Sequence, residues 1–339
     1  MSRQEQRVRL HETIQYAANS TRSAELARGG KFRELHLRLQ GQVTVTAGNN
    51  TAAKTNRGDE WAVIRELTLR ANGDTILRYM TADELRFYNY LMYSQVPMLT
   101  AGIGDATTAD PSFDSTLILP LWSPKMARPW DTILESNKLA RIDLDVRWGN
   151  EDDISDDATA FTVNPTLEVT VVENNGGPED PDPAKGLAHP LTEIVRMVET
   201  PSGANTNFRV KLPVGEQKVY ERFIINTQNS SGVDVNTLVT DVKLVSGPVT
   251  LFSEKYKTIL QSMRQRWQIP SGWDGGSAAI QRLARSTANH QDGWIVLDLC
   301  GDGRATEGIS AADLPELYLE FNVAAQGTIN ILPICRKQM

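Results

Sequence analysis

The chain has 339 residues, a formal net charge of −7, and 40% hydrophobic and 23% charged residues. This length permits roughly two domains of about 150 residues each, and the acidic balance gives no reason to expect wholesale nucleic-acid binding. The chain lacks an apolar run near the ~20 residues that span a bilayer, its polar opening lacks a signal-peptide pattern, and its two cysteines are too few for a disulfide scaffold.

Residues 1–30 are polar and locally basic. Through position 33 the chain carries seven basic and three acidic residues. We expect an N-terminal arm that orders on a neighbour. The alternative is an arm that lies on an anionic surface, either lipid or nucleic acid. Four apolar residues are spaced to line one side of a short helix: Val8, Leu10, Ile14 and Tyr16.

Residues 32–46 alternate between apolar and polar side chains, which predicts a strand. His36 falls on the polar phase of this strand, so we interpret it as a surface histidine and not as a ligand. A polar loop over 47–60 follows and contains Arg57-Gly58-Asp59. That tripeptide can serve in cell adhesion, but a single copy is common by chance.

Residues 61–97 predict a strand that begins at Trp61, then a tight turn, a return strand and a capped helix. The turn is marked by Asn72-Gly73, because glycine adopts a positive φ without steric cost. Thr81 and Glu84 have the spacing of a capping box, and Pro97 ends the unit. Apolar residues then recur at helical spacing: Leu85, Tyr88, Leu91 and Met92.

The same plan recurs over residues 236–270. Gly247 replaces the glycine of the turn, Ser253 is the expected N-cap of the helix, and Pro270 closes the unit. The offset is 175 residues both from Leu69 to Leu244 and from Leu144 to Leu319. A near-constant offset close to half the chain length predicts a duplicated domain.

The remaining alternating segments complete two β-rich halves, separated by a Gly- and Pro-rich linker. We expect an arm at 1–30, a first domain at 31–173, the linker at 174–190 and a second domain at 191–339. Residues 98–114 and 271–293 are interpreted as long loops, the second with a short helical pattern. Further strands are predicted over 115–122, 138–148, 160–172, 192–198, 206–212, 218–226, 294–300, 316–323 and 327–335.

Residues of catalytic type are present without a catalytic pattern, so no catalytic, cofactor-binding or metal-binding residue is assigned. The acidic stretch 151–157 lacks the spacing of a calcium loop, and the tryptophans are better explained by packing than by sugar binding. Pairing of Cys300 with Cys335 stays open, although a reducing cytosol disfavours it. The four histidines are isolated in the sequence: His11, His36, His189 and His290.

Two consecutive β-rich halves, each with a helix after an early strand pair, resemble the double jelly-roll major capsid proteins of tailless icosahedral bacteriophages such as PRD1 and PM2. The resemblance covers about residues 30–339, and its most suggestive text is 65–93. It implies an all-β fold of two consecutive jelly-roll β-sandwiches, each with an inserted α-helix. Six or seven strands can be counted per half where a jelly roll has eight, so missing strands would lie in segments such as 98–114 and 271–293.

The resemblance implies a structural protein of the virion and not an enzyme, with no cofactor and no small-molecule substrate. It would form a homotrimer with six similar lobes, contact neighbouring trimers and penton or minor capsid proteins, and assemble in the host cytoplasm. The N-terminal arm would contact an internal membrane or the genome. Two other functions stay open: a carbohydrate-binding or tail-associated adhesion module, and a β-sandwich hydrolase with a carboxylate pair.

Overall fold

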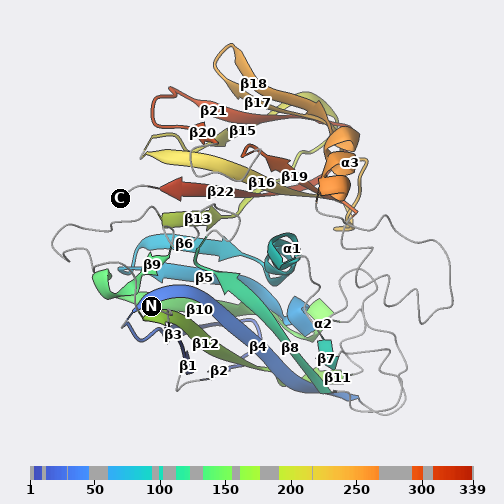
Figure 1. Cartoon of the computed structure of the whole chain (residues 1–339). Coiled ribbons are helices and arrows are strands. Elements are labelled where there is room, and N and C mark those ends of the chain that lie inside the picture. Colours follow the sequence, from blue (N-terminus) through green and yellow to red (C-terminus); the bar gives the residue numbers. More distant parts are fainter. Residues whose placement is uncertain are drawn as a thin grey trace. The chain divides into compact units, whose positions relative to one another are not determined.

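The computed structural model divides by its internal contacts into unit 1 (Met1–Thr192) and unit 2 (Glu193–Met339). In Figure 1, unit 1 runs from blue to green and unit 2 from yellow to red, and strands dominate both. The division falls within β13 (Leu191–Val195). The structure describes residues 4–9, 13–28, 30–45, 60–93, 99–101, 112–122, 133–154, 161–175, 191–215, 217–266, 292–300 and 308–337.

The first sheet of unit 1 has the strand order β1-β12-β4-β8-β7, and short strands join β12 and β4 at its margins. β4 turns Leu35, Leu37 and Leu39 into the core, where each is fully buried, and this confirms the predicted alternation. The strands are β1 (Gln4–Arg9), β2 (Ile14–Gln15), β4 (Lys31–Val45), β7 (Leu99–Ala101), β8 (Ser112–Pro120), β9 (Leu134–Glu135), β11 (Phe161–Val163) and β12 (Thr166–Asn175).

The second sheet of unit 1 has the order β6-β5-β10-β3, and a helix follows β6. Its strands are β3 (Thr21–Glu25), β5 (Ile64–Ala71), β6 (Thr75–Met80) and β10 (Ile142–Trp148). The helical segments are η1 (Glu60–Val63), α1 (Ala82–Tyr93), η3 (Ser136–Lys138) and α2 (Glu151–Ile154).

Unit 2 is built from one sheet that contains β19-β16-β22 in that order and from a second sheet with the order β15-β21-β17-β18. A single helix among the described residues of the unit, α3 (Tyr256–Arg266), follows β18 and contacts β19. The strands are β14 (Met197–Glu199), β15 (Asn205–Leu212), β16 (Lys218–Asn229), β17 (Val239–Ser246), β18 (Val249–Lys255), β19 (Trp294–Asp298), β20 (Ile309–Ser310), β21 (Leu317–Val323) and β22 (Gly327–Lys337).

The two units repeat one strand order, because β6-β5-β10-β3 corresponds to β18-β17-β21-β15. The registers agree as well: Leu69 lies opposite Leu144 in unit 1, and Leu244 lies opposite Leu319 in unit 2. All four leucines are fully buried. The 175-residue offset therefore relates β5 to β17 and β10 to β21, and in each unit the two related leucines lie opposite each other on neighbouring strands. This confirms the predicted duplication.

The predicted hairpin and capped helix of unit 1 are confirmed. Asn72 and Gly73 have φ of 54° and 86° and form the turn between β5 and β6. The Thr81 N–H donates to Glu84 Oε2 at 2.8 Å, and the Glu84 N–H donates to Thr81 Oγ1 at 3.2 Å. Both side chains satisfy backbone N–H groups at the start of α1. The expected strand start at Trp61 is wrong, since this residue lies in η1.

In unit 2 the expected N-cap at Ser253 is wrong. β18 continues to Lys255 and α3 begins at Tyr256. The reason is the ladder with β17, in which Ser253 and Lys255 lie opposite Lys243 and Asp241. Backbone pairing and the opposite charges of Asp241 and Lys255 favour the extended conformation for two more residues.

The helix expected near the N-terminus is also wrong. β1 pairs antiparallel with β12, from Gln4 opposite Asn175 to Arg9 opposite Thr170, and β3 pairs with β10. The strands that the prediction lacked in the first half therefore include β1 and β3 of the N-terminal segment, and the short β7 lies within 98–114 as expected. The described residues supply eight principal strands to this half: β1, β3, β4, β5, β6, β8, β10 and β12.

Other boundaries differ by a few residues from expectation. The strand expected from 138 starts at Ile142, after η3, and the strand expected over 160–172 is split into β11 and β12 around Pro165, which has no N–H to donate. The linker from 176, both proline stops and the helical pattern within 271–291 lie outside the described residues. None of the described helices is long and apolar enough to cross a membrane.

Candidate functional site

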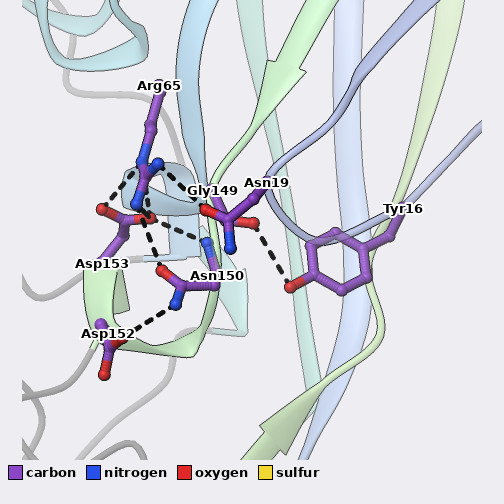
Figure 2. Close-up of polar contacts among 7 residues, drawn as sticks. All are labelled: Tyr16, Asn19, Arg65, Gly149, Asn150, Asp152 and Asp153. Atoms are coloured by element: carbon purple, nitrogen blue, oxygen red, sulfur yellow. Dashed lines mark hydrogen bonds and ion pairs between the residues drawn. The ribbon is translucent and has the colours of Figure 1, made fainter.

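A polar cluster at one end of unit 1 is centred on Arg65 of β5 (Figure 2). Arg65 Nε donates to Asp153 Oδ1 and Oδ2 at 3.1 and 2.9 Å. Its Nη1 donates to Asn19 Oδ1 at 3.0 Å, and its Nη2 donates to Asn150 Oδ1 at 3.3 Å. The guanidinium thus connects three segments: its own strand β5, the residues before β3 that include Asn19, and the residues after β10 that include Asn150 and Asp153.

The described part of the acidic stretch after β10, Glu151–Ile154, forms the short helix α2. The Asn150 N–H donates to Asp153 Oδ2 at 2.8 Å, and Asn150 Nδ2 donates to Asp152 Oδ2 at 2.8 Å. These contacts cap α2 and use its carboxylates. Within the described part of the chain, no three His, Cys, Asp or Glu residues are grouped to hold a metal ion.

Gly149 brings the N-terminal segment against this cluster. Its carbonyl oxygen accepts hydrogen bonds from the Asn19 N–H at 3.0 Å and from the Tyr16 hydroxyl at 3.5 Å. Tyr16 also meets Trp148 edge to face, with ring centroids 5.5 Å apart. Burial, with the nearby Glu151 and Asp153 carboxylates, raises the pKa of Tyr16 to about 12. The cluster fastens chain segments together and presents no nucleophile beside a base.

A second charged group surrounds Glu34 on β4, a carboxylate that is 3% exposed. Glu34 Oε1 accepts from Arg33 Nη2 at 2.8 Å and lies 3.0 Å from His36 Nε2, and Oε2 accepts from the Tyr93 hydroxyl at 3.4 Å. Burial raises the pKa of Glu34, but the hydrogen bonds and charges of His36 and Arg33 outweigh it and lower the pKa to about 2. His36 is therefore a half-buried partner of a carboxylate, not the surface histidine expected.

The other residues singled out in the sequence are dispersed. Trp61, Trp148 and Trp294 are buried, which confirms the packing interpretation for these three. Cys300 and Cys335 are buried and are not joined in a disulfide, and burial raises the pKa of their thiols to about 11 and 12. Outside the described residues lie His11, His189, His290, Trp130, Trp267, Trp273 and Arg57-Gly58-Asp59.

Large apolar side chains reach the surface at few described positions. Four are exposed, Ile76, Val198, Val249 and Leu251, and none is aromatic. Val249 and Leu251 lie on β18, the last strand of its sheet. Neither this edge nor the Arg65 and Glu34 clusters were predicted from the sequence.

No protein-family model and no curated protein sequence matches the chain. Solved structures match it over nearly its full length. The STIV major capsid protein has a TM-score of 0.74 at 12% identity and covers 98% of this chain and 97% of its own. A structure of Sulfolobus turreted icosahedral virus gives 0.73 at 14% identity, covering 98% and 90%.

The major capsid protein P2 of bacteriophage PM2 gives a TM-score of 0.60 at 10% identity, covering 98% of this chain and 97% of its own. PBCV-1 VP54 gives 0.59 at 10% identity, covering 98% and 94%. At these identities the similarity shows the fold. The chain has the double jelly-roll fold shared by these capsid proteins, as the strand orders of both units also indicate.

Proposed function

We propose that the chain is a major capsid protein that assembles with copies of itself into an icosahedral virus shell. The observation that carries the proposal is the extent of the fold similarity: 98% of this chain aligns with 90–97% of chains from capsids. Because neither this chain nor the capsid chains have a large unaligned portion, the similarity covers the whole fold and not a single module of it.

The assembly state and surroundings belong to the same proposal. The duplicated jelly roll supports a homotrimer with six similar lobes, which can tile a shell beside penton or minor capsid proteins. The protein would reside in the virion after assembly in the host cytoplasm. A bacteriophage origin stays a prediction. The structures with a similar fold come from a wider range of viruses, which includes a Sulfolobus virus.

The domain limits are proposed as 31–173 and 191–339, joined by the linker 174–190, although Asn174 and Asn175 still belong to β12 and pair with β1. The strands formed by residues 4–9 and 21–25 extend the first domain toward the N-terminus. β1 is the outermost strand of its sheet among the described residues. This position leaves one side of a basic strand for an internal membrane or the genome, the partner proposed for the N-terminal segment.

A carbohydrate-binding or adhesion module is the alternative, and it needs aromatic platforms on the surface. The large apolar side chains exposed on the described part of the chain are aliphatic, which favours the capsid proposal. Native mass spectrometry of the purified chain tests it. We expect a species of three times the 37.6 kDa chain mass, and a monomer at all concentrations that also binds a glycan array would contradict it.

A further inference from the structure

We propose that the open edge of β18 is a contact with a second copy of this chain; the inference rests on the proposed function. β18 ends the order β15-β21-β17-β18 and forms a hairpin with β17 (Figure 1). Val249 is 55% exposed and Leu251 is 39% exposed. Among the described residues, the outer side of the strand therefore has no ladder partner and the strand carries exposed apolar side chains, the combination that favours pairing with another strand.

Two other edge strands of the described structure, β15 and β3, are protected by charged side chains. β15 carries exposed Arg209 and Lys211, and β3 carries exposed Arg22 and Glu25. Charges of this kind oppose pairing with a further strand. The first half of β18, Val249 to Phe252, has no charged residue and no proline.

The edge of β8 is protected by a side chain that imitates a strand. Asn89 of α1 donates from Nδ2 to the Ile118 carbonyl at 2.5 Å, and its Oδ1 accepts from the Ile118 N–H at 2.7 Å. Both ladder groups of Ile118 are thereby satisfied within the chain. In the described part of the chain, β18 has β17 as its one ladder partner, and no side chain of this kind covers its other side.

The equivalent strand of unit 1 is not the last of its sheet, because β13, which begins in unit 1, follows β6 in the strand order. In β6, Ile76 is 38% exposed, whereas Leu77 and Met80 are buried, and the buried Arg78 donates to the carbonyl oxygens of Pro120, at 3.2 and 3.0 Å, and of Thr192. The same position in the duplicated fold is thus followed by a further strand in one unit and is the last described strand of its sheet in the other. A second copy brings apolar and backbone groups of the kind that cover such an edge.

The size of the edge favours a repeated contact within an assembly. Seven residues extend about 23 Å at ~3.3 Å per residue, whereas a specific interface buries roughly 800 Å² on each partner. β18 alone is too narrow for that area. α3 follows β18 directly and contacts it, so the exposed Lys257 and Gln261 of α3 would extend the proposed contact beyond the strand.

The test compares two variants that add the same charge to the same sheet. Leu251→Lys places a lysine on the bare edge, and Thr206→Lys places one on the exposed opposite edge in β15. We expect Leu251→Lys to raise the concentration required for assembly by about tenfold or more, while Thr206→Lys assembles like the wild type. Thermal melting of the separated subunits is expected to be alike, because both positions are exposed.

Hydrogen exchange of the wild type gives a second readout. Amides of residues 249–252 are expected to exchange more slowly in the assembly than in separated subunits. If Leu251→Lys misfolds, Leu251→Thr, which keeps strand propensity, takes its place. A wild type that never associates overturns the proposed function. A wild type that associates while the β18 variant assembles equally well, with no slowing at 249–252, overturns the β18 contact alone.

Discussion

At the scale of single residues, the close approach of Arg65 and Asp153 determines that position 149 must be a glycine. The Arg65 guanidinium and the Asp153 carboxylate meet directly over Gly149. A Cβ at position 149 would overlap Asp153 Oδ2 and lie 2.8 Å from Asp153 Cγ. The glycine is therefore required by the contact between these two side chains and not by a turn.

Gly149→Ala is expected to destabilise the protein by about 1–3 kcal/mol, because Asp153 must leave Arg65 and the Asn150 N–H to admit the methyl group. Gly203→Ala is the matched control, since a Cβ there has no atom within 4 Å. Urea denaturation of both variants measures the difference. Equal stability of the two variants would contradict the assigned role of Gly149.

Glu34 is expected to make stability depend on pH in the acid range. Its folded pKa of about 2 lies below its ordinary value of 4.5, so its contribution is present above about pH 4.5 and is lost as the pH falls toward 2. The shift corresponds to at most about 3 kcal/mol. Glu34→Gln should therefore be less stable than wild type at pH 7, and most of the gap should be gone by pH 2.5. A gap that is constant over this range would refute the linkage.

At the scale of elements, what could be predicted depends on where the partner lies in the sequence. The cap of α1 was predictable because Thr81 and Glu84 are three residues apart. β1 was not, because its partner β12 begins more than 150 residues later and its own apolar spacing also fits a helix. The Arg65–Asp153 pair was missed for the same reason, although the Asn150–Asp153 spacing could have indicated a helix start.

The two helix starts give a direct comparison, since the sequence treats Thr81 and Ser253 as equivalent. Thr81→Ala is expected to lower stability by about 1 kcal/mol because it removes a cap from α1. Ser253→Ala is expected to change stability by less than about 0.5 kcal/mol, because Ser253 is an exposed residue of β18. Thermal or urea melts measure both, and equal losses would mean that Ser253 caps α3 after all.

At the scale of the whole molecule, the duplication was the feature that could be predicted most directly from the sequence. Leucines 175 residues apart occupy matching, fully buried positions of β5 and β17 and of β10 and β21, because a buried register tolerates little drift. The surface proposed to meet other copies could not be predicted from the sequence. An exposed edge such as β18 is visible only once its neighbours along the sheet are known.

The most direct test of the capsid proposal is negative-stain electron microscopy of the purified chain under conditions that favour assembly. We predict closed particles, or sheets, tiled by capsomers of roughly hexagonal outline, each built from three chains. Isolated single chains in every field, at concentrations where the protein remains folded, would contradict the claim that this double jelly roll builds a shell.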